Sequence, residues 1–496
     1  MKLSRRHYDA IIIGAGLSGL TCALLLARSG RKVLVLEQHS SPAPVVSGFQ
    51  RDGIYFDSGF HYAGGLGEGG PLQLLLRHLG LEDKLQLFPY TASGFDCLRL
   101  SSSGEEYSLP VGFNNIRSYL GEKFPQATAE IGLYLDEIAS TWRNFPYLDL
   151  DIDLDDFGME SVHGCSLRER LEVFSPWPQL QGLLSMHSLL YGVSPEQAPL
   201  FLNAQVAGSY YHSVHGIIGG GRSLIAALQE LLVNAGVEIR CNAEVAQILV
   251  SNETIQGVRL SSGEDFLSQE VIATLNPTQL PEMLATSKLR PAYLKRINNL
   301  RQTPSAYIVF ARSRQPLDLL RGCNLFVQPQ AGVFSSAEDC PLEQRSFYLT
   351  GADQGQGGAI KGLIGIVPAT MAEVPSPQLP GKPRSSEYRE WKKQLGVRLL
   401  RMFRESCPAL PPLELLELAT PLTLHDYSNA PQGAVYGVGR FLGQYNPHPV
   451  TRLPGLFLSG QATAAPGLLG TLVASYLSCG SILGHDYLRG ELKACR

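Results

Sequence analysis

Two short apolar runs near the start of the chain enclose a stretch that predicts a helix. Residues 8–13 and 32–36 are mostly apolar, and the helical stretch between them ends at Gly30. A strand that is apolar at nearly every position is typical of a parallel sheet covered on both faces. The pattern therefore predicts a strand–helix–strand unit at the start of an α/β fold.

The remaining predicted elements fall into two groups with different patterns. Elements resembling the first unit are a helix over 222–234, a helix over 470–488, and strands over 237–240, 244–250, 256–260, 270–274 and 455–460. Elements of a second, mixed lobe are helices over 71–79, 129–142, 167–190 and 388–407, and strands over 95–109, 307–310 and 362–367. Because the groups alternate along the chain, one domain is predicted to be discontinuous, with the second lobe inserted twice.

The turn between the first strand and the first helix carries the pattern G-x-G-x-x-G. Gly14 allows a sharp turn, Gly16 lets the backbone approach a pyrophosphate, and Gly19 lets the helix pack closely on the sheet. Glu37 ends the second strand, where a carboxylate can accept both hydroxyls of an adenosine ribose. No arginine follows Glu37 to bind a 2′-phosphate. The unit therefore predicts a site for FAD or NAD.

A triple glycine at 219–221 is a second candidate for such a turn. It lacks a suitable preceding strand, and no acid ends the strand that follows its helix. We therefore interpret these glycines as positions of close packing. His212 and His215 could suggest a metal site, but no nearby cysteine or glutamate set completes the ligands, and no metal is predicted.

The amino-acid composition restricts the kinds of binding partner and the cellular compartment that are expected for this chain. The 496 residues are 44% hydrophobic and 17% charged, with a net charge of −4, so no electrostatic footprint for nucleic acid is present. Nine cysteines without a C-x-x-C pair indicate reduced thiols and a cytoplasmic setting. No uninterrupted apolar stretch is long enough to span a bilayer. Peripheral contact with a membrane stays open.

A second glycine-rich turn follows the predicted strand at 455–460. Gly460 and Gln461 lead to Gly467 and Gly470, where a helix begins. A helix N-terminus at this place can stabilise negative charge on a reduced flavin ring near N1.

Taken together, these stretches resemble the FAD-dependent phytoene desaturases, carotenoid isomerases and retinol saturases, within the amine-oxidase-like flavoproteins. The resemblance includes residues 57–62 with Gly64, residues 419–423, and the later positions Asn429, Gly433, Tyr436 and Gly437. It implies a Rossmann-type FAD-binding domain with an inserted α+β substrate-binding lobe. The expected FAD domain comprises residues 1–75, 215–290 and 415–496, and the expected lobe comprises 76–214 and 291–414.

The resemblance also assigns roles to single positions. Gly14, Gly16 and Gly19 would hold the FAD pyrophosphate, Glu37 the ribose, and the main chain of Val245 the adenine. Gly460 and Gln461 would contact the ribityl–phosphate region, and the isoalloxazine would lie near Gly470, Thr471 and Leu472. The same cofactor-binding set includes Leu17, Ser18 and Gln38.

One position departs from the family pattern. Where the family has two glycines soon after the ribose acid, this chain has Ala43 and Pro44. Proline lacks an N–H and fixes φ, so any contact that the family makes through a backbone donor there is lost.

The resemblance assigns catalysis to His61 and Tyr62, which could give or take a proton at a double bond. The alternative is a polar pair that is hydrogen-bonded within the domain wall. Tyr191, Tyr210 and Tyr211 could line a tunnel for an apolar substrate, but ordinary core packing is the preferred interpretation.

The expected activity is FAD-dependent desaturation, saturation or isomerisation of a polyene or isoprenoid lipid, such as a carotenoid or retinoid. The absence of an Arg/Lys cluster that could clamp an anion agrees with an apolar substrate. With no second nucleotide domain predicted, electrons are expected to pass to or from a quinone, oxygen or a redox protein. The alternatives are an amine-oxidase or porphyrinogen-oxidase-type enzyme, or a non-catalytic flavin-binding protein.

Overall fold

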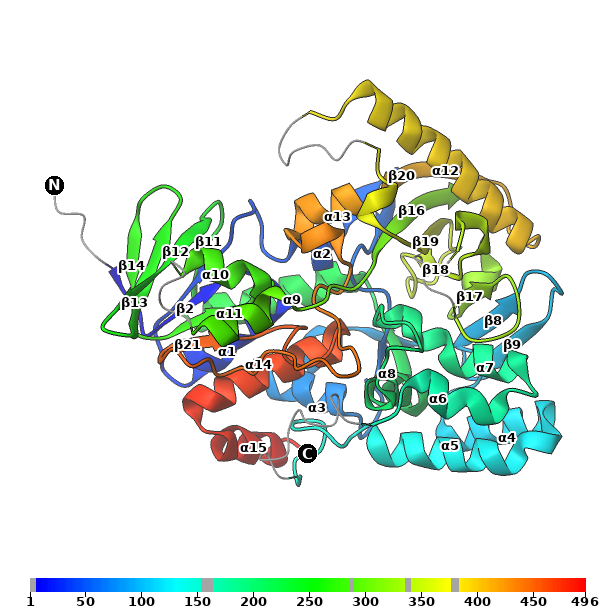
Figure 1. Cartoon of the computed structure of the whole chain (residues 1–496), viewed down its shortest axis with the longest axis horizontal. Coiled ribbons are helices and arrows are strands. Elements are labelled where there is room, and N and C mark those ends of the chain that lie inside the picture. Colours follow the sequence, from blue (N-terminus) through cyan, green and yellow to red (C-terminus); the bar gives the residue numbers. More distant parts are fainter. Residues whose placement is uncertain (1–5, 153–163, 285–289, 335–339, 376–382) are drawn as a thin grey trace.

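Strands from distant parts of the sequence form one sheet in the left half of the molecule as drawn in Figure 1. The computed structural model describes residues 6–152, 164–284, 290–334, 340–375 and 383–496. The sheet has the order β11-β3-β2-β15-β21, and all its pairs are parallel. Its strands are β2 (Ala10–Ile13), β3 (Val33–Leu36), β11 (Glu238–Arg240), β15 (Val271–Ala273) and β21 (Leu456–Leu458).

Both faces of this parallel sheet are covered, as the apolar strands predict. Ile12 packs toward α1 (Leu17–Arg28), α9 (Gly220–Asn234) and α14 (Gly467–Leu483), whereas Ile11 packs against a four-stranded sheet on the other face. That second sheet consists of β1 (Arg6–His7), β14 (Asp265–Leu267), β13 (Thr254–Leu260) and β12 (Val245–Ser251). Because successive side chains point to opposite faces of each strand, the sheet lies between two separate hydrophobic cores and contributes residues to both.

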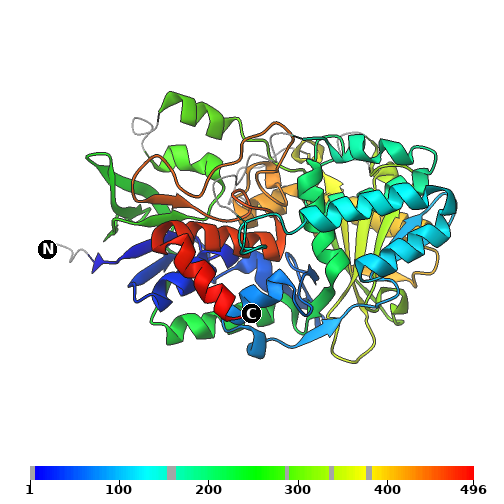
Figure 2. The same cartoon turned by 90° about the horizontal axis from the view of Figure 1, so that it is seen from below.

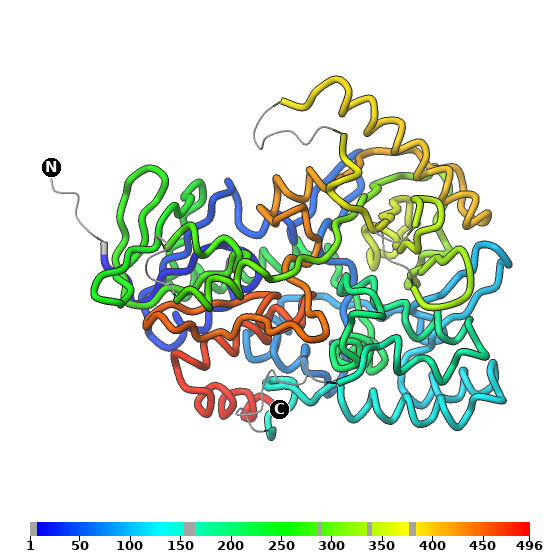
Figure 3. Tube along the Cα trace, in the orientation of Figure 1, coloured from blue at the N-terminus to red at the C-terminus, as the bar shows by residue number. Residues whose placement is uncertain are grey.

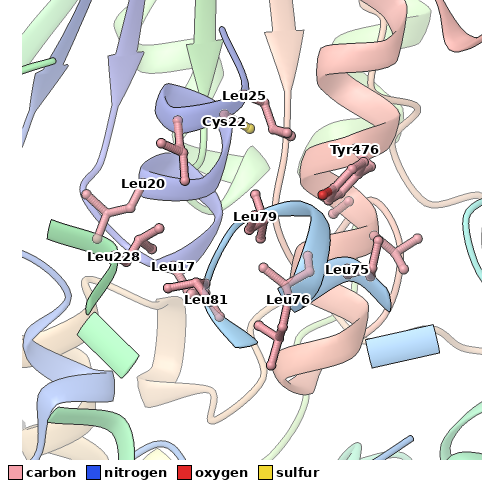
Figure 4. Close-up of a cluster of buried hydrophobic side chains, with 14 of the residues drawn as sticks. Leu17, Leu20, Cys22, Leu25, Leu75, Leu76, Leu79, Leu81, Leu228 and Tyr476 are labelled. Atoms are coloured by element: carbon pink, nitrogen blue, oxygen red, sulfur yellow. The ribbon is translucent and has the colours of Figure 1, made fainter. Parts of the chain in front are cut away.

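The two ends of the chain meet in the core beneath α1. Leu17, Leu20 and Leu25 of α1 lie beside leucines of α3 (Pro71–His78) and beside Tyr476 of α14 (Figure 4). Each fully buried leucine contributes about 1.5–3 kcal/mol to stability. The trace in Figure 3 follows this return of the C-terminal segment to the N-terminal unit.

A seven-stranded sheet organises the other half of the molecule. Its order is β20-β16-β19-β18-β17-β8-β9. The strands are β8 (Asp96–Leu100), β9 (Glu106–Leu109), β16 (Ser305–Ser313), β17 (Asn324–Gln328), β18 (Phe347–Ala352), β19 (Gly362–Ala369) and β20 (Leu413–Ala419). One face packs on α12 (Ser386–Ser406) through Leu395, Leu399 and Phe403. Residues of the opposite face, including Ile308 and Tyr348, face the interior between the two halves.

Helices cover part of that interior face, as the view from below shows (Figure 2). They are α4 (Phe113–Lys123), α5 (Thr128–Thr141), α6 (Leu167–Leu171), α7 (Pro178–Ser185) and α8 (Leu200–His212). Smaller elements complete the fold. They are the sheet of β6 (Ala63–Gly64), β10 (Val214–Ile217) and β7 (Leu87–Pro89), the hairpin of β4 (Phe49–Arg51) and β5 (Ile54–Phe56), and the helices α2 (Pro44–Ser47), α10 (Leu280–Met283), α11 (Pro291–Asn298) and α13 (Pro421–Ser428).

Two details of the sequence prediction need comment. The single helix expected over 470–488 is wrong, because Gly484 adopts a φ of 98° and separates α14 from α15 (His485–Ala494). The triple glycine is confirmed as a place of close packing, since a Cβ on Gly221 would lie 1.9 Å from the carbonyl oxygen of Val46.

The division of the chain into domains stays a prediction. β20 pairs with β16 in the seven-stranded sheet, although its last residues lie within the expected third FAD segment. Across the described part of the chain, no helix combines the length and apolar character needed to cross a membrane.

Candidate functional site

A cavity of about 460 Å³ lies where the two halves meet. The parallel-sheet half supplies the beginning of α1, the turn after β21 and the first turn of α14. The other half supplies strand residues of β16, β18 and β19. Connecting segments complete the wall over residues 58–61, 188–190, 192–195, 274–277 and 434–438.

Two helices begin at this cavity without a capping side chain. α1 starts after Gly16 and α14 starts after Pro466. Neither of these N-cap residues has a side chain that accepts a hydrogen bond from the first N–H groups of its helix. The first N–H groups of a helix lack partners inside it, and the helix dipole adds positive potential there. Two uncapped helix ends on one cavity suit a ligand with two electron-rich parts, such as the diphosphate and the ring of FAD.

The glycines of the first turn create space for such a ligand. Gly14 adopts a φ of 100°. A Cβ on Gly19 would lie 2.0 Å from the carbonyl oxygen of Gly14, so this position tolerates only glycine. A Cβ on Gly16 would instead meet nothing within 4 Å, and Gly16 lines the cavity together with Leu17 and Ser18. The turn is therefore closed on its sheet side and open on its cavity side.

The predicted adenosine-binding residues lie together, away from the cavity wall. The Glu37 carboxylate accepts the N–H groups of Ala15 at 2.7 Å and His39 at 2.9 Å. The main chain of Glu37 also accepts the N–H of Ala243, which brings the start of β12 at Val245 close to it. Gln38, between Glu37 and His39, is exposed. The carboxylate is thus fixed beside the glycine turn, and its ribose-binding role stays a prediction.

Residues of the C-terminal turn have different surroundings. Gly460, with a φ of 107°, lines the cavity together with Gln461 and Thr471. Gly470 lines a second, smaller cavity of about 130 Å³, and a Cβ there would lie 2.3 Å from the carbonyl oxygen of Ala465. Leu472 lines neither cavity, because its side chain is buried in the core beneath α1. Leu472 could therefore meet a ligand only through its main chain.

Three serines connect the two glycine turns. The Oγ atoms of Ser18 and Ser459 lie 2.7 Å apart, and Ser18 Oγ lies 3.0 Å from Ser475 Oγ of α14. These buried contacts hold the two helix ends in a fixed relation. The arrangement lets two turns whose serines are 441 positions apart in the sequence face one ligand.

Ala43 occupies the position at which the family pattern has glycine. It adopts a φ of 44°, in the left-handed region, and its N–H donates to the carbonyl oxygen of Ala15 at 2.9 Å. Pro44 then takes the first position of α2, where a helix needs no N–H from that residue. The left-handed conformation is therefore kept without glycine, at some expense in stability.

We expect Ala43→Gly to stabilise the protein. An L-residue in the left-handed region is strained by about 1–2 kcal/mol, and the greater freedom of glycine when unfolded offsets part of the gain. The net gain in the free energy of unfolding should be about 0.5–1 kcal/mol, measured by urea denaturation. Ala235→Gly, at a φ of −83°, is the control and should give no gain. An equal gain in both variants would contradict the strain argument.

His61 lines both cavities, and the residue as a whole is partly buried. Its Nδ1 is enclosed, and no described residue hydrogen-bonds to that atom. Burial lowers the pKa of His61 from 6.5 to about 4. At neutral pH the imidazole is therefore uncharged, with one nitrogen able to accept a proton and the other able to donate one.

This lowered pKa predicts a loss of stability in acid. Between about pH 6.5 and pH 4 the unfolded chain binds a proton at His61 more readily than the folded chain. The stability that the uncharged His61 ring contributes to the folded protein is fully present above pH 6.5 and is lost as the pH falls toward 4. We expect the wild type to lose about 1–2 kcal/mol more than His61→Gln between about pH 7.5 and pH 5. Urea denaturation at both pH values measures this, and equal losses would contradict it.

Tyr62 belongs to a buried polar network beside the cavities. Its hydroxyl donates to Asp96 Oδ2 at 2.9 Å, and burial raises the pKa of the phenol. His187 Nε2 lies 2.8 Å from the same oxygen, and Asn324 donates to Asp96 Oδ1 at 2.8 Å. Asp96, His187 and Asn324 are fully buried. Because the Tyr62 hydroxyl is held by Asp96, its ring rather than its hydroxyl is placed to form cavity wall, and its catalytic role stays a prediction.

Aromatic rings form much of the wall near His61. Tyr348 lies on the first cavity, Tyr210 on the second, and Tyr436 on both. The Tyr62 ring lies 4.7 Å from the ring of Tyr210 and 6.3 Å from that of Tyr348. Tyr191 and Tyr211 are buried in the adjacent core instead, as the preferred interpretation predicted. Tyr210 both packs against that core and lines the smaller cavity, and its role toward a substrate stays a prediction.

The described lining of both cavities contains no Asp, Glu, Lys or Arg side chain. Its polar groups are hydroxyls, amides and the neutral imidazole of His61. Away from the two helix ends, such a surface suits a neutral, largely apolar guest, because an unpaired charge would be poorly solvated there.

Comparisons with known proteins agree with this geometry. The family described as flavin-containing amine oxidoreductases matches residues 17–474. The all-trans-retinol 13,14-reductase of Macaca fascicularis is 26% identical over 539 residues, covering 98% of this chain and 87% of that protein. The chloroplastic prolycopene isomerase of Daucus carota is 25% identical over 299 residues, covering 54% and 46%. An oxidoreductase from Methanosarcina mazei has the same fold, with a TM-score of 0.67 at 18% identity over 96% of this chain and 99% of that one. The predicted fold class is confirmed.

Proposed function

We propose that this chain, which belongs to the family of flavin-containing amine oxidoreductases, is an FAD-dependent oxidoreductase acting on carbon–carbon bonds of a polyene or isoprenoid lipid. The relatives that it matches along nearly its whole length are named for a reaction of retinol, and others for isomerisation of a carotenoid. A retinoid or carotenoid is a long, neutral, apolar molecule of the kind that the cavity suits.

The uncharged cavity wall is the observation that carries this proposal. An amine substrate is protonated at neutral pH, and a carboxylate would compensate its charge best, with aromatic rings as a weaker substitute. The lining supplies no carboxylate among the described residues, and its single histidine is uncharged. The amine-oxidase alternative is therefore less well supported than action on a polyene.

The protein's own groups would position the substrate and manage one proton. Bound FAD supplies the transfer of a hydride or electron pair. The apolar wall around Tyr348 and Tyr436 would exclude water and hold the polyene flat against the cofactor. The His61 imidazole would exchange a proton with the neighbouring substrate carbon. The uncapped end of α14 would stabilise negative charge on the cofactor ring.

We propose saturation as the main direction, because the relatives matched over nearly the full length are named as reductases. The electron partner stays a prediction: for saturation the donor would be a reduced quinone or a reduced redox protein, whereas oxygen could serve only as the acceptor in the reverse, desaturating direction. Contact with a membrane is likewise a proposal, in keeping with lipid substrates.

An anaerobic substrate panel tests the proposal. Purified protein with photoreduced FAD is mixed separately with retinoids, carotenoids and amines, and oxidised protein is mixed with the same panel. We expect reduced FAD to be reoxidised by a retinoid or carotenoid while the polyene absorption is lost. Bleaching of the oxidised protein by amines, with no reaction toward polyenes, would overturn it.

We expect His61→Ala to slow this reaction at least tenfold and to retain FAD, because the imidazole is needed for proton transfer and not for the cofactor. His212→Ala is the control, since the His212 side chain lines neither cavity and bonds to Ser213 instead. Turnover and flavin absorption are measured for both. Unchanged turnover in His61→Ala would show that His61 only forms part of the cavity wall and takes no part in proton transfer.

A further inference from the structure

Arg440 is a buried arginine behind the cavity wall. The residue as a whole is only 6% exposed. One of its guanidinium nitrogens donates a hydrogen bond to the carbonyl oxygen of Thr463 at 2.6 Å. Its Nε is enclosed and has no hydrogen-bond partner among the described residues. A guanidinium has five N–H donors, so this one is far from satisfied by the protein.

The charge on Arg440 also lacks compensation. None of the ion pairs formed by the described residues includes Arg440. Burial lowers the pKa of its guanidinium to about 10, and desolvation is the only influence on that value, so the group stays charged at neutral pH. A buried charge without a partner is strongly unfavourable. Arginine at this position therefore calls for an anion that the protein itself does not supply.

The position of Arg440 identifies where that anion would be. The segment just before it contributes Gly437 and Val438 to the cavity wall. Its hydrogen-bond acceptor, Thr463, closes the turn that begins at Gly460, and that turn forms the neighbouring part of the wall, where Gln461 lies beside Gly437. Arg440 thus lies between two wall segments of the cavity into which α1 and α14 open.

We propose that Arg440 is a built-in counter-charge for the flavin nucleotide, without a charged protein partner of its own among the described residues and neutralised by negative charge of the bound cofactor. The anionic group is either the permanent diphosphate or the ring once it is reduced. In both cases the attraction acts across a low-dielectric wall and is screened little by salt. The proposal concerns cofactor charge only and does not depend on the identity of the substrate.

Four proteins test it: the wild type, Arg440→Gln, Arg440→Lys and Arg301→Gln. Glutamine keeps a donor for Thr463 but removes the charge, and lysine keeps the charge. Arg301 is the matched control, because it lies over the ring of Phe441, next to Arg440, and is exposed to solvent. For each full-length protein, FAD is removed and the apo-protein's melting temperature and its dissociation constant for ADP are measured. The midpoint potential of bound FAD is then measured after reconstitution.

We expect apo Arg440→Gln to melt at or above the wild-type temperature, since an uncompensated charge has been removed. If the diphosphate is the partner, ADP should bind about tenfold more weakly to Arg440→Gln. If the reduced ring is the partner, ADP binding should be unchanged and the midpoint potential should fall. Arg440→Lys should recover part of either effect, and Arg301→Gln should show neither. A lower apo melting temperature, or an unchanged ADP affinity together with an unchanged potential, would overturn the proposal.

Discussion

Gly16→Val is expected to abolish FAD retention and to leave the fold intact. Gly16 has a φ of −67°, which any residue can adopt, and its Cβ would enter open space at the cavity. A valine side chain would therefore fill the space between the end of α1 and the cofactor diphosphate rather than clash with protein. Loss of close approach to the N–H groups of α1 should weaken binding by at least 100-fold, or about 3 kcal/mol.

The flavin absorption of the purified protein and FAD titration of the apo-protein measure this effect. Gly490→Val is the control, because a Cβ on Gly490 also meets nothing within 4 Å, but this glycine lies in α15 away from the cavity. Both variants should unfold within about 0.5 kcal/mol of the wild type in the apo state. Normal FAD retention by Gly16→Val would show that the cofactor diphosphate lies elsewhere.

The first turn was predictable because its chemistry is local. Gly14, Gly19 and Glu37 lie within one strand–helix–strand unit, and the spacing of that unit fixes what surrounds each of them. The apolar strands likewise predicted a sheet covered on both faces, because burial on each side requires apolar residues at successive positions. The exception is Ala43, whose left-handed conformation no sequence rule for alanine indicates.

The rest of the cavity depends on how distant segments meet. Tyr348 lies on β18 of the seven-stranded sheet, and its alternation with Leu349 decides which of the two side chains faces the cavity. Sequence alternation gives two faces but not the identity of the neighbour on each. Arg440 is even harder to identify from the sequence. Nothing in the residues around it indicates that its side chain is buried or that it lacks a carboxylate partner.

The network around Asp96 was missed for the same reason. Its partners His187 and Asn324 lie 91 and 228 positions away, and neither forms a motif with it. Only Tyr62 was identified, through its resemblance to a family pattern. A signal existed in Asp96 itself, since an aspartate directly before the apolar residues Cys97 and Leu98 of a strand is unusual unless its charge is paired.

Asp96→Ala is expected to destabilise the protein by about 3–5 kcal/mol. The substitution removes the acceptor of the Tyr62 hydroxyl, the His187 ring and the Asn324 amide, and all three lie where water does not reach. The loss therefore includes the desolvation of donors left without partners as well as the bonds themselves. Urea denaturation monitored by circular dichroism measures the change in the free energy of unfolding.

Replacing two members of the network at once separates pairing from packing. Asp96→Leu alone leaves His187 unpaired, whereas Asp96→Leu with His187→Leu removes both polar partners and keeps the volume filled with apolar atoms. The double variant should therefore be less destabilised than the sum of the single variants by at least about 1 kcal/mol. Additive losses would show that Asp96 and His187 contribute independently. They would also remove the reason for treating the Tyr62 ring as held in place by a coupled polar network.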